Sequence, residues 1–442
     1  MNTALKHWKE AASLILVAGK RLGVDRLPSR TPLTSGSSPG SSLGRSHLPH
    51  SSCFDYDVLL LKRSGESGFM PNAYVFPGGT TESSDFSSEW LDIFESFRNF
   101  PNFGLRSVKQ PAETRPPIYA TDRLKLGSPI PGEVAFRICA LRETFEESGV
   151  LLFVSKLEQE SLLKSLENRC ASDQVPHYTV NELCGSELIK WRALVNQDPS
   201  NFIRMCRELQ VLPNIWALHE WSNWLSPTRL KRRFDTAFFM CCLQETPHTL
   251  QDKKEIVHFQ WSTPTEALQS YQGREIWIPP PQFYELSRMC RFPLLKDLHS
   301  FASQRATEGC ERWMSVNFSQ NGYRISVLPG DRFYPLDTLG ENKVDSSTGP
   351  QLKDLQEGCP LHRMVFWDAY TTILHITIKT KYNQLLPIVE PALSHGSNSQ
   401  LSLVPASPLY TWNESHPHVV IMVFLMVILT ASGFCFINEA LI

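Results

Sequence analysis

The sequence predicts an α/β protein, because two kinds of segment alternate along it. Short apolar runs that are typical of buried strands occur at Ala12–Ala18, within Asp55–Arg63 and at Val150–Val154. Other stretches repeat their apolar residues with the period of a helix, most clearly in a segment that begins near Gly132. The core is therefore expected to combine a sheet with helices.

The predicted helix from Gly132 carries the group of residues on which a functional hypothesis can be built. Its apolar stripe is formed by Val134, Ile138, Leu141 and Phe145. Glu143, Glu146 and Glu147 fall on the opposite face, and Gly149 stands where a helix would end. Carboxylates on one helical turn suit hard cations such as Mg²⁺ or Mn²⁺. The alternative is an ordinary solvated acidic face.

Two motifs resemble the halves of a Nudix box. Arg142-Glu-Thr-Phe-Glu-Glu-Ser-Gly-Val150 resembles its second half, with Thr144 as a departure at the first apolar position, and Phe76-Pro-Gly-Gly79 resembles its opening loop. Asp85 stands where the box has its first glutamate. About 49 residues look inserted between the halves, by comparison with the consensus spacing. A split box is similar to that of the coenzyme A diphosphatase branch, nucleoside diphosphate-linked moiety X motif nineteen.

This resemblance implies a Nudix α/β/α sandwich with a mixed sheet and a metal-dependent hydrolase. The substrate would be coenzyme A or acyl-coenzyme A, cleaved at its diphosphate to 3′,5′-ADP and (acyl-)4′-phosphopantetheine. Glu146 and Glu147 would bind Mg²⁺ or Mn²⁺, and Glu143 would be a further ligand or the base that orients water. Arg142 could pair with Glu146 one turn away and hold its orientation.

Substrate-binding residues are expected in the glycine loop and in two basic stretches. Gly78 and Gly79 would let the backbone approach the substrate closely, and Arg63, with Ser64, matches a pair found in related coenzyme A-cleaving enzymes. A second, dense cluster consists of Arg229, Lys231, Arg232 and Arg233. It is interpreted either as a phosphate site, since arginine binds phosphate bidentately, or as a solvated loop.

The predicted domain organisation follows from these motifs and from composition. A hydrolase domain spans 8–302 and contains the insertion at about 86–130, which would form a lid or a wall of the substrate site. A C-terminal extension with strands follows at 303–386, and a linker at 387–417. The segment 1–21 has a weak basic bias, and a strand is favoured there over a targeting peptide.

The last segment is apolar enough to suggest a membrane anchor. Val419–Ile437 contains no charged residue, so a transmembrane helix is predicted at 418–437, with a buried core helix as the alternative. The hydrolase domain would then face a reducing compartment, since the eleven cysteines show no disulfide framework. By resemblance the membrane would be that of a peroxisome or a mitochondrion, although Ala440-Leu441-Ile442 is not a clear peroxisomal address.

The composition excludes one class of function and leaves several open. A formal net charge of −2 argues against a dedicated binder of duplex nucleic acid. Coenzyme A or acyl-coenzyme A hydrolysis competes with hydrolysis of another nucleoside diphosphate derivative, such as a nucleotide sugar, a dinucleotide or capped RNA. A non-catalytic, membrane-tethered nucleotide-binding module or scaffold is the remaining alternative.

Overall fold

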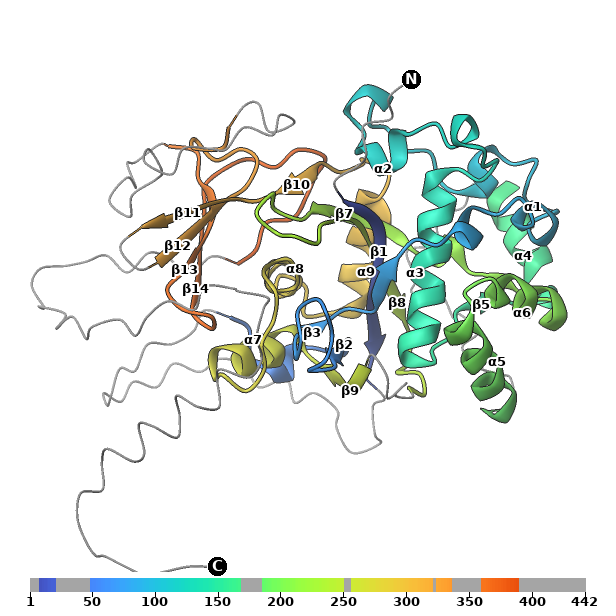
Figure 1. Cartoon of the computed structure of the whole chain (residues 1–442), viewed down its shortest axis with the longest axis horizontal. Helices are drawn as coiled ribbons and strands as arrows, with labels where there is room; N and C mark the ends of the chain where they lie inside the picture. Colours follow the sequence, from blue (N-terminus) through green and yellow to red (C-terminus); the bar gives the residue numbers. More distant parts are fainter. Residues whose placement is uncertain are drawn as a thin grey trace, which may run out of the picture. The chain divides into compact units, whose positions relative to one another are not determined.

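Strand β1, Lys9–Gly19, is the centre of an eight-stranded mixed sheet in the computed structural model of the protein (Figure 1). It runs parallel to β8 and antiparallel to β2 and β4. Strands β10, β7, β8, β1, β2 and β3 follow one another across the sheet, with β4 paired to β1 and β9 paired to β2. The other strands of this sheet are β2 (Tyr56–Arg63), β3 (Tyr74–Val75), β4 (Gly78–Thr80), β7 (His219–Leu225), β8 (Phe234–Leu243), β9 (Ile256–Ser262) and β10 (Arg312–Met314).

The structure describes residues 8–20, 48–167, 185–249, 256–320, 323–335 and 359–388. The chain divides into a unit of residues 1–393 and a second unit of residues 394–442. All described residues belong to the first unit, and the predicted linker at 387–417 lies almost wholly outside them.

Helices cover both faces of the sheet. They are α1 (Trp90–Ile93), α2 (Pro117–Ala120), α3 (Gly132–Ser148), α4 (Lys156–Glu167), α5 (Gly185–Gln197), α6 (Asn201–Leu209), α7 (Pro264–Gln272), α8 (Pro280–Met289) and α9 (Leu295–Arg305). Leu14 and Leu16 of β1 are buried in a core with α3, α5 and α6, whereas Ile15 and Val17 are buried in another with α7, α8 and α9. This alternation follows from the two-residue period of a strand. The predicted α/β/α sandwich with a mixed sheet is confirmed (Figure 1).

One part of the predicted fold class is wrong, namely the transmembrane helix. No helix among the described residues is long and apolar enough to cross a membrane. Crossing takes about 20 apolar residues. The longest described helix, α3, has 17 residues and carries several charged side chains. The segment 418–437 itself lies outside the described residues.

The central helix α3 begins and ends where the sequence predicts. Gly149 adopts φ 72°, and its N–H donates to the carbonyl of Phe145, which closes the last turn. Other boundaries differ from the prediction. The apolar run at Val150–Val154 contributes only the short strand β5, Phe153–Val154, paired with β6, Leu212–Pro213.

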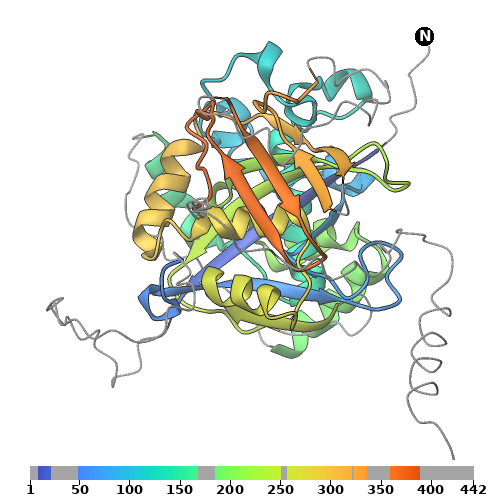
Figure 2. The same ribbon diagram turned by 90° about the vertical axis from the view of Figure 1, so that its left-hand side faces the viewer.

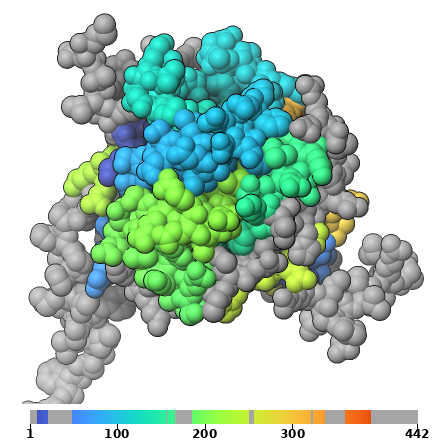
Figure 3. Space-filling model, turned by 90° about the vertical axis from the view of Figure 1, so that its right-hand side faces the viewer, coloured from blue at the N-terminus to red at the C-terminus, as the bar shows by residue number. Residues whose placement is uncertain are grey.

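The insertion at 86–130 is part of the core. Trp90, Phe94 and Phe97 are almost completely buried, and they pack with α3 and α6 in one continuous apolar cluster. Figure 3 shows that the insertion and the segments of α5 and α6 form much of the surface on this side of the molecule. The aromatic spacing in this segment therefore marks packing residues, and the insertion is anchored through them.

A second sheet follows the hydrolase region, as the predicted C-terminal strands suggest. It is antiparallel and consists of β11 (Val316–Gln320), β12 (Tyr323–Val327), β13 (His362–Phe366) and β14 (Thr372–Ile376). Figure 2 shows this small sheet in front of the large one. Met364, Phe366 and Leu374 reach the apolar core of α8 and α9, so the two sheets share a packed interface.

A buried carboxylate joins α8 to strand β7 of the large sheet. Glu285 is fully buried and accepts hydrogen bonds from the ring N–H groups of Trp221 and Trp224, at 2.6 and 2.7 Å. It also accepts from the Ser222 hydroxyl and from the Arg288 guanidinium. A β-bulge between residues 220 and 222 shifts the register of β7 at this point. The neighbouring side chains Trp221 and Ser222 therefore both reach the same carboxylate.

We expect Glu285→Ala to lower the free energy of unfolding by about 3–5 kcal/mol, because it leaves Arg288 buried without its counter-charge. Chemical denaturation measures this change. Glu95→Ala is the matched control, since Glu95 is exposed, and it should shift stability by less than about 0.5 kcal/mol. Equal effects of the two substitutions would contradict the structural role of Glu285.

Candidate active site

The glycine loop and α3 come together because β4 pairs with the start of β1. Gly78 and Gly79 lie opposite Ser13 and Ala12 in this ladder. Gly78 has φ 154°, a backbone conformation that residues with a side chain rarely adopt. Its N–H donates to Oε2 of Glu147 at 2.8 Å, and Glu147 is only 4% exposed. The loop therefore fixes one carboxylate of the helix directly.

The backbone of Gly79 lies directly against a second carboxylate, that of Glu143. A Cβ atom at this position would lie 2.5 Å from the carboxylate of Glu143. Only a glycine leaves Glu143 in its present position. Sixty-four positions of sequence separate the two residues, and the structure brings them into contact as the split motif predicts.

Arg142 is the hub of the site. Its Nε and Nη2 donate to the two carboxylate oxygens of Asp85, both at 2.9 Å, in a bidentate pair whose members are each 1% exposed. Its Nη1 donates to Glu143 at 2.9 Å and to Glu146 at 2.8 Å. Nη2 also donates to the carbonyl of Thr80. One guanidinium thus connects the loop before the insertion with the helix after it.

The acidic face of α3 is largely withdrawn from water. Glu147 is buried, and the side chains of Glu143 and Glu146 are each only 14% exposed. Burial raises the pKa of Glu143 to about 8, with Arg142 opposing the shift and Glu146 adding to it. The reading of this face as an ordinary solvated surface is therefore not supported by the geometry.

The three glutamates of α3 fit a divalent cation by charge and by chemistry. Glu143, Glu146 and Glu147 offer hard oxygen donors, whereas both oxygens of Asp85 accept from Arg142. Within the described part of the chain, no three acidic, His or Cys side chains already converge as ligands of one ion. Glu143 and Glu146 accept from the same Nη1, so metal binding requires their carboxylates to turn from it.

Arg63 supports a loop at the same end of the sheet. Its Nε and Nη2 donate to Ser67 Oγ, at 3.2 and 2.9 Å, and Nε also donates to the carbonyl of Phe69. This arginine shapes the turn that follows β2. The turn contacts the start of β8, where the rings of Phe69 and Phe234 lie 4.9 Å apart.

The members of the basic cluster are not equivalent. Arg232 is exposed and lies against the turn after β2, because a Cβ on Gly68 would meet its guanidinium. Arg233 instead donates to the carbonyl of Ser226 and stacks over Trp8. Arg229 and Lys231 are exposed. The cluster lies at the end of the sheet where β1 begins and where the glycine loop is paired.

Two contacts that support the carboxylate site could not be predicted from the sequence pattern. Arg192 of α5 donates from Nε to the carbonyl of Glu146 at 2.8 Å. Arg123 of the insertion pairs with Glu10 of β1 at 2.8 Å, next to the loop that follows β4. Each contact joins segments that are far apart in the chain. The sequence alone does not indicate such a contact, because a single arginine can also be a solvated surface residue.

Comparison with known proteins agrees with this geometry. A sequence model of the NUDT19 Nudix domain matches residues 8–289, and a model of the NUDT19 C-terminal domain matches residues 317–377. The chain belongs to the NUDT19 family of Nudix hydrolases. Nudix hydrolases generally use a divalent metal ion, in keeping with the carboxylate site.

Relatives in this family are similar over most of their length. Acyl-coenzyme A diphosphatase NUDT19 of Xenopus laevis is 46% identical, over 88% of this chain and 97% of the relative. Its counterpart in Gallus gallus is 44% identical, over 91% of this chain and 100% of the relative. A crystal structure of a Nudix hydrolase from Alicyclobacillus acidocaldarius matches 66% of this chain and 96% of that chain, with 17% identity and a TM-score of 0.42.

We expect Gly79→Ala to lower hydrolytic turnover by about 100-fold or more, because the added Cβ displaces the Glu143 carboxylate by about 1 Å. The carboxylate is the end of a flexible side chain, so the fold should survive. Gly185→Ala is the control, since a Cβ there meets nothing within 4 Å. Steady-state kinetics with thermal unfolding makes the comparison, and unchanged turnover in Gly79→Ala would exclude the close approach as a constraint.

Proposed function

We propose that the chain hydrolyses the diphosphate bond of coenzyme A and acyl-coenzyme A, releasing 3′,5′-ADP and 4′-phosphopantetheine or its acyl ester. The observation that carries this proposal is the closed Nudix site, in which Arg142 joins Asp85 to Glu143 and Glu146 while Gly78 holds Glu147. Relatives that align over nearly their whole length are named acyl-coenzyme A diphosphatases, which supports the choice of substrate.

The chain's own residues have distinct roles in the proposed reaction. Glu143 lies against the glycine loop and accepts from Arg142, which places its carboxylate where it could accept a proton from attacking water. Arg142 is a positioning residue that orients Glu143 and Glu146. Glu146 and Glu147 would hold Mg²⁺ or Mn²⁺, and Glu143 could also contribute an oxygen. A bound cation would neutralise diphosphate oxygens and lower the pKa of water.

Incubation of the purified chain with coenzyme A and Mg²⁺ or Mn²⁺ should yield 3′,5′-ADP, identified by mass spectrometry. Glu146→Gln and Glu147→Gln should each lower turnover by about 100-fold or more, because charge stabilisation of several kcal/mol is lost. Glu158→Gln changes an acid of α4 outside the box and should have little effect. Turnover of a nucleotide sugar, a dinucleotide or capped RNA in place of coenzyme A would contradict the proposed substrate.

The basic cluster is proposed to bind the 3′-phosphate of coenzyme A. Arg229 and Arg232 are its best candidates, because both are exposed at the end of the sheet where the glycine loop lies, whereas Arg233 is engaged by Ser226 and Trp8. A lost charge-assisted contact costs about 1.5–3 kcal/mol. The two candidates can therefore be distinguished by single substitutions.

Arg229→Ala or Arg232→Ala should lower kcat/KM on coenzyme A by about 10- to 150-fold and leave 3′-dephospho-coenzyme A nearly unaffected. The control is Arg98→Ala, an exposed arginine of the insertion. Equal losses on both substrates would show that neither arginine reads this phosphate.

The chain is further proposed to work in a reducing compartment, of a peroxisome or a mitochondrion by resemblance. The support is that the eight described cysteines are free thiols, six of them buried as packing residues. Cys241 and Cys242 are adjacent on β8, and they belong to the cores on opposite faces of the sheet.

A further inference from the structure

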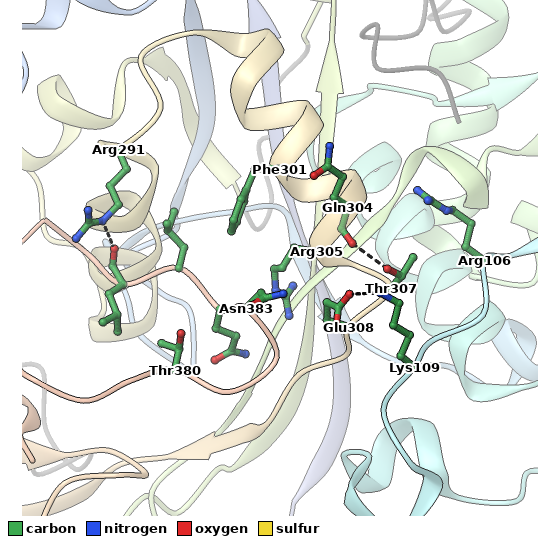
Figure 4. Close-up of a pocket in the computed structure, with 13 residues that line it drawn as sticks. Arg106, Lys109, Arg291, Phe301, Gln304, Arg305, Thr307, Glu308, Thr380 and Asn383 are labelled. Carbon is green, nitrogen blue, oxygen red and sulfur yellow. Dashed lines mark hydrogen bonds and ion pairs between the residues drawn. The ribbon is translucent and has the colours of Figure 1, made fainter. Parts of the chain in front are cut away.

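A cavity of about 760 Å³ lies between α9, the segment 380–386 and the part of the insertion around Arg106 and Lys109 (Figure 4). Its lining residues and the residues of the carboxylate site belong to separate sets. Cavities of about 300–1,000 Å³ are the size that holds small-molecule ligands. The proposed hydrolysis does not use this cavity.

Positive charge dominates the lining. Four basic side chains, Arg106, Lys109, Arg291 and Arg305, stand against the single carboxylate of Glu308. Lys109 pairs with that carboxylate at 2.6 Å. The three arginines donate to neutral acceptors instead: Arg106 to Ser303, Arg291 to the carbonyl of Pro387, and Arg305 to the carbonyls of Glu220 and Gly309. Arg305 is buried and lies within the field of the Glu220 and Glu285 carboxylates. Arg106 and Arg291 are exposed, and their printed acceptors are uncharged, so their positive charge favours an anionic ligand.

An aromatic surface completes the cavity. Phe301 lies between Arg291 and Arg106 in Figure 4, and its ring packs on Phe292 and Trp221, with centroids 5.0 and 6.1 Å away. Leu385 and Leu386 add apolar surface. A planar or apolar body next to an anionic group would match this combination.

Two residues that line the cavity, Gln384 and Arg305, have side-chain polar atoms without a hydrogen-bond partner among the described residues. Gln384 is 4% exposed, and neither its amide oxygen nor its amide nitrogen has a partner among the described residues. Nε of Arg305, which is 3% exposed, is likewise without a partner in the described part of the chain. Burying such groups without hydrogen bonds is costly. A rotation of the Gln384 side chain toward the cavity would let a bound ligand satisfy its amide.

We propose that this cavity binds an organic phosphate of nucleotide size. Arg106 and Arg291 supply the positive charge that attracts the phosphate, Phe301 packs against the body of the ligand, and the Gln384 amide turns to hydrogen-bond it. Such a ligand would bind independently of hydrolysis.

Isothermal titration of the full chain in chelator, with 5′-AMP and 3′,5′-ADP as probes, tests this site. Saturable binding should weaken at least tenfold in Arg106→Glu/Arg291→Glu and stay unchanged in Arg98→Glu and in Arg232→Glu, which removes a proposed phosphate contact of the catalytic site. Adenosine and inorganic phosphate, each alone, should bind more weakly than either probe. Should the double variant lose thermal stability, the single variants Arg106→Gln and Arg291→Gln replace it.

Binding that is lost in Arg232→Glu and kept in the double variant would place the probes in the catalytic site and overturn the proposal. So would the lack of saturable binding by either probe, or equal binding of phosphate alone. Because the readout is binding in chelator, a chain that fails to hydrolyse coenzyme A can still pass this test.

Gln384→Leu separates a ligand-binding role from a structural one. Removing two unsatisfied polar atoms should raise the melting temperature of the free protein while weakening nucleotide binding severalfold. A lowered melting temperature with unchanged binding would assign Gln384 to packing and overturn its part in the site.

Discussion

The pairing of Arg142 with Asp85 is the interaction on which the site depends. Both groups are buried, and a buried guanidinium is tolerated only with its charge and hydrogen bonds satisfied. Burial alone would lower the pKa of Arg142, but Asp85 and Glu143 raise it well above its ordinary value, so it stays charged. Asp85 stands before the insertion and Arg142 after it. Any disturbance that separates the two halves of the motif must therefore break this pair.

The insertion does not disrupt the site, because both its aromatic side chains and the ion pairs of Arg115 attach it to the rest of the domain. Its aromatic residues fill the space beyond α3, and Arg115 donates both Nη groups to Glu220 of β7 while Nη2 also reaches Glu133 in the first turn of α3. Burial would raise the pKa of Glu220, yet Arg115 holds that pKa below its ordinary value. Such an arrangement fixes where α3 begins, and so where its carboxylates lie.

Short-range patterns in the sequence predicted much of this. The apolar stripe and the terminal glycine of α3 and the apolar run of β1 each act within a few residues, and both elements are confirmed. The contact between the glycine loop and α3, which the resemblance to a split motif predicts, is also confirmed. Thr144, a departure from the consensus, is buried and donates to the carbonyl of Ala140, which satisfies its hydroxyl inside an apolar position. The uses of Arg63, Arg192 and Arg123 depend on contacts that no local spacing encodes. The predicted roles of the site residues stay predictions.

The same buried network reaches from the carboxylate helix to the arginine-lined cavity. Arg305 donates to the backbone carbonyl of Glu220, whose side chain is held by Arg115, and Arg115 reaches Glu133 at the start of α3. A chain of contacts gives a physical route between two sites, and coupling additionally requires an element with two arrangements. Glu220 is instead held at both its carboxylate and its carbonyl. The network therefore has a structural role: it holds α3 in place and keeps its carboxylates preorganised for the phosphate chemistry.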